Sequence, residues 1–191
     1  MTMRARTAVV LATWLVVAVA AAQSRDHAGQ VELTFTIHDR GVAQVAVLRY
    51  ELDAVLSLAR DGRARLRVRG TLDRTHTTMI PPGGPSDETS RHLAVDRVHE
   101  GRVRARDADG ITIAFDDGLD WRCDRTTERI AERSRAVLRC AVATPHAGLP
   151  WRDPAPAYLR APMVLAPDGD VRAVVDASAE RSPYVRLAPR R

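Results

Sequence analysis

The chain of 191 residues contains no lysine and no asparagine, and aromatic residues make up only 4% of it. All 29 basic residues are therefore arginines, which excludes chemistry that needs a lysine amine, such as Schiff-base formation or a Ser-x-x-Lys site. A nucleic-acid-binding surface combines a basic stripe with stacking aromatic side chains. Here charges of both signs are interspersed and aromatics are few, so we expect no nucleic-acid partner.

Charge is nearly absent from residues 1–22, where Arg4 and Arg6 precede an apolar run that ends in alanines. This layout is typical of a secretory signal peptide, here cleaved before Gln23. The run is shorter than the roughly 20 residues that a membrane-spanning helix needs. We therefore expect a signal helix, export to the periplasm or the extracellular space, and no transmembrane segment in the mature chain. An uncleaved N-terminal anchor is the alternative.

Cysteine is scarce as well, since Cys123 and Cys140 are the only two. An even pair in an exported chain predicts one disulfide. Two cysteines are too few for a structural zinc site, which usually takes four ligands, and their spacing is not that of a Cys-x-x-Cys redox pair.

The dominant pattern that is present is alternation of apolar and polar residues with a period of two, as in residues 31–37. Such alternation indicates half-buried strands. The pairs Asp61-Gly62, Asp109-Gly110 and Asp117-Gly118 are typical hairpin turns. We predict a mainly β fold, a single antiparallel β-sandwich or open barrel of roughly 8–10 short strands.

Alternation in residues 63–73 places arginines on one face of a strand and apolar residues on the other. We interpret the arginine face as solvated, with contact to an anionic surface as the functional alternative. The arginines would be explained if this were an edge strand, where charged side chains prevent pairing with other chains. The arginines are Arg63, Arg65, Arg67 and Arg69, and the apolar face includes Ala64, Leu66, Val68 and Leu72.

Residues 124–136 interrupt the alternation, and their polar, Arg- and Glu-rich composition predicts one short helix. We also expect a turn at Gly101 and a final hairpin formed by residues 163–165 and 171–175. The predicted organisation is a signal peptide (1–22), an antiparallel β domain (23–145) and a Pro-rich arm with a C-terminal β-hairpin packed on the same domain (146–191).

Candidate chemistry is sparse. His76 stands among threonines at a strand end beside a Pro-Gly loop, which makes it the catalytic candidate, against the simpler reading of a polar strand end. Four aspartates resemble a fragment of a calcium loop, although turn chemistry explains their Asp-Gly pairs equally well. These calcium candidates are Asp107, Asp109, Asp116 and Asp117. We expect no cofactor.

Residues 33–45 (LTFTIHDRGVAQV) resemble an early strand of the YceI-like family, in which a histidine precedes a Gly-Val pair. That resemblance implies an exported, lipocalin-like barrel that binds isoprenoid lipids. The order of His38 and Asp39 departs from the family pattern, so no site residue follows from the resemblance.

Three functions remain open. The first is a non-catalytic binding or envelope-associated module, whose partner is an envelope protein or a small apolar ligand. The second is a lipocalin-like barrel that holds a small apolar ligand or lipid in a cavity. The third is a hydrolase with a dispersed active site, for which His76 or His99 hydrogen-bonded to a carboxylate in a cleft would be the sign.

Overall fold

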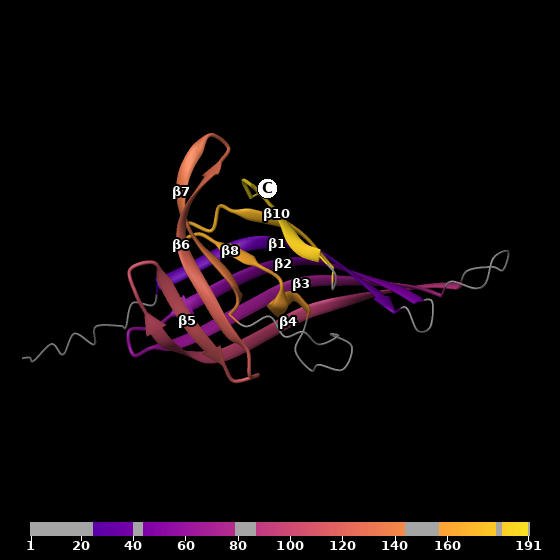
Figure 1. The fold of residues 1–191 in the computed structure, drawn as a ribbon, viewed down its shortest axis with the longest axis horizontal. Coiled ribbons are helices and arrows are strands. Elements are labelled where there is room, and N and C mark those ends of the chain that lie inside the picture. The colour runs from indigo at the N-terminus through magenta and orange to yellow at the C-terminus, as the bar shows by residue number, and fades with distance from the viewer. Residues whose placement is uncertain (1–24, 40–43, 79–86, 144–156, 179–180, 191) are drawn as a thin grey trace, which may run out of the picture.

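A computed structural model describes residues 25–39, 44–78, 87–143, 157–178 and 181–190, and strands dominate it. Ten strands form one curled sheet, a half-barrel, in the order β10-β9-β1-β2-β3-β4-β5-β6-β7-β8 (Figure 1). The mainly β prediction is confirmed, and the single curled sheet matches the predicted open barrel, not the predicted sandwich. The elements are β1 (Arg25–Asp39), β2 (Gln44–Leu58), β3 (Arg63–Thr78), β4 (Asp87–Arg106), β5 (Gly110–Phe115), β6 (Asp120–Ile130), β7 (Arg133–Val142), α1 (Ala157–Arg160), β8 (Met163–Leu165), β9 (Arg172–Ser178) and β10 (Arg181–Ala188).

The curl brings β8 back to β1. Directly after β8, Ala166 exchanges two backbone hydrogen bonds of 2.8 Å with Ala28 of β1. From Gln30 onward β1 instead pairs with β9, in parallel. The sheet is thus joined into a ring at one end of β1 and opened by β9 and β10 at the other. We call the ring, formed by β5–β8 and the parts of β1–β4 that face them, the body.

The interior of the body is filled with side chains. Trp121 is fully buried and stacks edge-on against Phe115, with ring centroids 5.3 Å apart. The short helix α1 adds Tyr158 and Leu159 to the same core. Every second residue along each strand faces inward, and the close packing of these apolar side chains stabilises the body.

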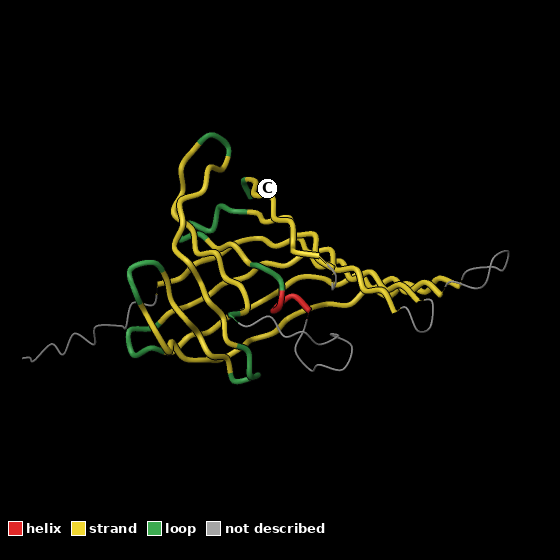
Figure 2. Tube along the Cα trace, viewed as in Figure 1, coloured by secondary structure: helices red, strands yellow, loops and turns green. Residues whose placement is uncertain are grey.

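Beyond the body, β1–β4 continue as a twisted extension, seen at the right of Figure 2. We call this extension the arm, a name used from here on for it alone and not for the Pro-rich segment of residues 146–191. Its outer pair of strands consists of residues 71–78 of β3 and 87–98 of β4. Gly70 stands where the arm begins, with a φ of 151°. A Cβ atom there would lie 1.9 Å from the backbone oxygen of Glu51, so only glycine allows this close approach of β2 and β3.

Several sequence predictions are confirmed. The Asp61-Gly62 turn joins β2 to β3, and Gly62 has a φ of 84°. The Asp117-Gly118 turn joins β5 to β6 in the same way. In β3, Leu66 and its apolar neighbours are buried while the arginines are exposed. That arginine face does not guard an edge, however, because β3 lies between β2 and β4.

The helix predicted over residues 124–136 is wrong. Strand β6 continues to Ile130, Ala131 and Glu132 form a two-residue turn with φ of 45° and 66°, and β7 begins at once. Positive φ at both turn positions matches the twist of a hairpin. The pairing of β6 with β7, which runs from Trp121 to Ile130, together with the burial of Ile130, overrides the helical composition.

Two further predictions about strands need correction. Gly101 does not turn the chain but lies inside β4, where neighbouring backbone leaves no room for a side chain. Residues 163–165 and 171–175 do not form a hairpin, because β8 pairs with β7 and β9 pairs with β1. The C-terminal hairpin is instead β9–β10. The first four strands are long, not short.

The predicted signal helix of residues 1–22 lies outside the described residues. Within the described part of the chain, no helix has the length and apolar character needed to cross a membrane.

Candidate functional site

A pocket of about 730 Å³ opens at the end of the body that lies away from the arm. The β2–β3 turn, the end of β4 and the segment after β8 meet there, because these connections fall on the same end of the sheet. We call it the mouth pocket. Its lining residues are Asp26, His27, Leu58, Ala59, Arg60, Arg106, Ile111, Arg125, Leu138 and Pro167.

The mouth pocket combines an apolar floor with a basic rim. Leu58, Ile111 and Leu138 are buried core residues that line it. Arg60 and Arg106 make no ion pair within the described residues. Among the described residues, three arginines and one carboxylate line the pocket, so its charge favours an anion.

The β4–β5 turn holds the basic rim in place. The Asp107 carboxylate accepts hydrogen bonds from the backbone N–H groups of Asp109 at 3.0 Å and Gly110 at 2.7 Å, and from Arg122 Nη1 at 2.8 Å. The Arg122 guanidinium and these N–H groups lower the pKa of Asp107 to about 2. Arg125 Nη1 donates to the carbonyl oxygens of Asp107 at 2.8 Å and Ala108 at 3.1 Å. The turn is therefore ordered by the Asp107 carboxylate and by Arg122 and Arg125 of β6.

The four calcium candidates are not brought together. Asp107 and Asp109 belong to the β4–β5 turn, whereas Asp116 and Asp117 follow the opposite end of β5. Asp107 binds arginine and backbone N–H groups. Within the described residues, no group of three or more His, Cys, Asp or Glu side chains could hold a metal ion.

His99 lies between a carboxylate and a phenol. Its Nδ1 is 3.1 Å from Asp117 Oδ2, and its Nε2 is 2.9 Å from the hydroxyl of Tyr158. The Tyr158 ring is 2% exposed, and burial, with the nearby Tyr50 as a smaller cause, raises its pKa to about 12.

This arrangement resembles the relay of a hydrolase, but both ring nitrogens of His99 are engaged and its side chain is only 11% exposed. The hydroxyl on Nε2 belongs to Tyr158, which is buried and whose pKa is raised, so it is neither accessible to a substrate nor activated as a nucleophile. The network instead fastens α1 and the β5–β6 turn to β4. Sequence analysis missed this role because the three residues come from distant segments.

His76 lies in the arm, far along the sheet from the mouth pocket. It borders a depression of about 330 Å³ together with Arg74, Thr89 and Arg91. The lining residues that the structure describes include no carboxylate to orient the imidazole as a general base. The structure therefore places the catalytic candidate in a basic setting on an exposed part of the sheet.

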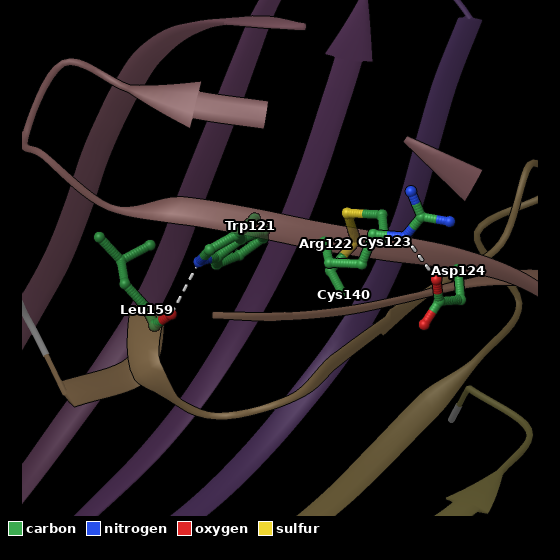
Figure 3. Close-up of a disulfide and its surroundings, with 6 residues drawn as sticks. All are labelled: Trp121, Arg122, Cys123, Asp124, Cys140 and Leu159. Carbon is green, nitrogen blue, oxygen red and sulfur yellow. Dashed lines mark hydrogen bonds and ion pairs between the residues drawn. A yellow bond between two sulfur atoms is a disulfide. The ribbon is translucent and has the colours of Figure 1, made fainter. Parts of the chain in front are cut away.

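Cys123 and Cys140 face each other on β6 and β7, with their sulfur atoms 2.09 Å apart, as in a disulfide (Figure 3). Both are fully buried. Next to them, Trp121 Nε1 donates a hydrogen bond of 2.8 Å to the carbonyl oxygen of Leu159. The predicted pairing thus ties two strands of the body beside the residue that anchors α1.

The arginines of the mouth pocket were not among the sequence candidates. Arg60 and Arg106 each directly precede an aspartate that opens a turn, at the ends of β2 and β4. Because alternate turns of an antiparallel sheet fall on the same end, this repeated Arg-Asp pair is the signal that could have located the rim.

No family model, curated protein or solved structure matches the chain. The resemblance of residues 33–45 to a lipid-binding family therefore gains no support from the comparisons. The fold and the site define a mainly β protein with a filled half-barrel and an anion-favouring pocket at its mouth.

Proposed function

We propose that the protein is an exported, non-catalytic binding protein whose mouth pocket takes a small amphipathic anion. The observation that carries this proposal is that buried apolar residues and the exposed Arg60 and Arg106 line one pocket. A carboxylate or phosphate head group would lie against the arginines, and a short alkyl chain would cover the floor.

The size of the pocket supports a small ligand. Ligand pockets in proteins are typically about 300–1,000 Å³, and the mouths of β-barrels are among their usual locations. The mouth pocket, at about 730 Å³, falls inside that range. The body core is occupied by Trp121, Tyr158 and Leu159. A ligand held deep inside, as in a lipocalin, would have to displace them.

The charges of the pocket support an anion. An arginine guanidinium binds carboxylate and phosphate oxygens through two parallel hydrogen bonds. Arg125 already donates to two backbone carbonyls, which leaves Arg60 and Arg106 as the groups that would bind the head group. Asp26 is the one opposing carboxylate among the described lining residues and would favour a singly charged head group over a larger anion.

Export is supported by two features. The N-terminal 22 residues have the layout of a signal peptide. The buried Cys123–Cys140 pair at disulfide distance suits an oxidising compartment.

Calorimetric titration of the oxidised protein tests the pocket. Octyl phosphate, octanoate and octanol present the same chain with a phosphate, a carboxylate and an uncharged head. We expect the two anions to bind and octanol to bind at least tenfold more weakly, because a hydrogen bond to a charged group contributes about 1.5–3 kcal/mol.

Arg60→Gln and Arg106→Gln should each weaken octyl phosphate binding about tenfold or more. Arg129→Gln is the matched control, since it removes one positive charge from the exposed end of β6, outside the pocket. Equal loss in all three variants, or equal affinity for octanol, would refute the proposed pocket function.

A further inference from the structure

We propose that the outer edge of β4 is a self-association surface on which the same strand of a second copy of this chain adds to the sheet. Strand β4 (Asp87–Arg106) is the longest strand, and β3 pairs with it from Asp87 to Arg102. Strand β5 covers its other side only from Gly101 to Arg106. In the part of the chain that the structure describes, residues 87–98 therefore have a neighbour on one side only.

Two backbone hydrogen bonds show which residues of β4 point their N–H and C=O groups away from β3. Asp116 N–H donates to the carbonyl oxygen of Glu100 at 2.9 Å, so Glu100 points its backbone groups toward the β5 side. Val103 N–H donates to Gly62 at 2.8 Å, on the β3 side. Directions alternate along a strand. The even-numbered residues from Glu88 to Val98 thus present unpaired N–H and C=O groups along about 34 Å of edge.

The edge carries charged side chains but lacks the stronger features that prevent pairing. It contains no proline, no lysine and no glycine. Leu93 and Val98 are 46% and 40% exposed. Asp96 is already partnered by Arg69 at 3.2 Å, and His92 by Asp73 at 2.6 Å, so these charges are compensated within one chain.

A second copy of the chain suits this edge, because the edge can pair with its own copy without bringing like charges together. A two-fold axis through the edge makes the two strands antiparallel, and the outward-facing even-numbered residues must oppose one another. Pairing the whole free edge, residues 88–98, centres the axis on Leu93. Leu93 then faces Leu93 of the second copy, and Arg91 faces Val95.

The neighbouring registers bring like charges together. Centring the axis on His92 places Glu88 opposite Asp96. Centring it on Ala94 places Arg91 opposite Arg97. Like charges directly opposite one another destabilise a strand pair, whereas the register centred on Leu93 has none. Of the registers centred on residues 92, 93 and 94, only the one centred on Leu93 is free of such pairs, and it is the one that pairs the whole free edge.

Cysteine cross-linking of the full, oxidised chain tests this register. Leu93→Cys should give a disulfide-linked dimer under mild oxidation, because residues directly opposite on antiparallel strands have Cβ atoms about 4.5–5.5 Å apart. Val98→Cys is the matched control, because Val98 is an apolar residue of similar exposure. In the proposed register it lies opposite residue 88 of the second copy, far from the second Val98. Cross-linking of neither variant, or of both equally, would overturn the proposal.

Sedimentation equilibrium supplies an independent readout. The wild-type protein should be dimeric at tens of micromolar. Ala94→Pro should raise the dimer dissociation constant at least tenfold with an unchanged circular dichroism spectrum, because it removes an N–H that points away from β3. Ala94→Ser, which keeps that N–H, should remain dimeric. A monomeric wild type, or a folded proline variant that dimerises normally, contradicts the inference.

Discussion

The body and the arm are built from the same strands and differ in what covers them. In the body, Leu66 of β3 is fully buried beneath α1 and β5–β8. Farther along the sheet, Leu93 of β4 has the same inward direction and is 46% exposed. Alternation along a strand sets which face a side chain takes, but burial depends on a second layer above that face.

Because of this difference, we expect the body to provide most of the stability of the fold and the arm to provide exposed surface for interactions. The body holds the aromatic core, the cysteine pair and the helix, so we expect it to determine the free energy of unfolding. The arm has backbone hydrogen bonds with little apolar cover, which is typical of segments that open locally. Its exposed edge and the mouth pocket are the surfaces left for partners.

The largest effect should come from the body core. Trp121→Ala removes a fully buried ring and its hydrogen bond to Leu159, and should lower the free energy of unfolding by about 3–5 kcal/mol in urea titrations. Leu93→Ala in the arm should change it by about 0.5 kcal/mol or less at concentrations where the chain is monomeric. Similar losses in the two variants would mean that body and arm are equally packed.

Removal of the cysteine pair should be the next largest effect. The variant with Cys123→Ala and Cys140→Ala should lose about 3 kcal/mol, because the closed loop no longer restricts the unfolded chain. Hydrogen exchange should speed up in β6 and β7 and stay unchanged in residues 71–78. An arm that loosens to the same extent would contradict the separation of the two regions.

The junction between body and arm depends on Gly70. Gly70→Ala places a Cβ atom 1.9 Å from the Glu51 backbone oxygen at a φ of 151°, and should cost about 1–3 kcal/mol. Gly62→Ala, at a turn with no atom near the added Cβ, is the comparison that separates φ strain from the clash. If the two variants are equally stable, the close approach of β2 and β3 does not constrain the junction.

The His99 network should contribute less. Tyr158→Phe removes the hydroxyl that contacts His99 Nε2 and should lower the free energy of unfolding by about 1 kcal/mol. The ring stays in the core, so the near-ultraviolet circular dichroism spectrum should be retained. A loss as large as that of Trp121→Ala would indicate that the network, and not apolar packing, holds α1.

The smallest effect concerns pH at the exposed β4–β5 turn. Because the folded pKa of Asp107 is about 2, below its ordinary 3.8, the ionised carboxylate stabilises the fold above pH 3.8, and this stabilisation is lost as pH falls through about 2. The stability difference between the wild type and Asp107→Asn should therefore shrink between pH 4 and pH 2 in thermal unfolding. A constant difference would show that the carboxylate charge is not what orders the turn.

Much of the sheet is predictable from sequence, for reasons visible in particular residues. The Asp61-Gly62 and Asp117-Gly118 turns carry glycines with positive φ, which a sequence can reveal. Ala131 and Glu132 adopt positive φ without any such signature, so the β6–β7 hairpin is invisible locally and its polar residues imitate a helix. The pairing of β6 with β7 in the folded sheet determines the structure of this segment.

The candidate site is less predictable. The cysteine pair follows from there being only two cysteines, whereas the mouth pocket depends on the curl of the sheet. Arg60 and Arg106 are 46 positions apart in the chain, by the difference of their numbers, and meet only because two turns fall on the same end. Local sequence patterns point to His76 and the four aspartates, but they carry no information on which distant turns lie together in the fold.

Hydrogen exchange with and without octyl phosphate tests most directly whether binding occurs at the mouth of the filled half-barrel. We predict slower exchange in the β2–β3 turn around Arg60 and in the β4–β5 turn around Arg106, with no change in residues 71–78 of the arm. Protection confined to the arm, or protection of neither turn at saturating octyl phosphate, would contradict it.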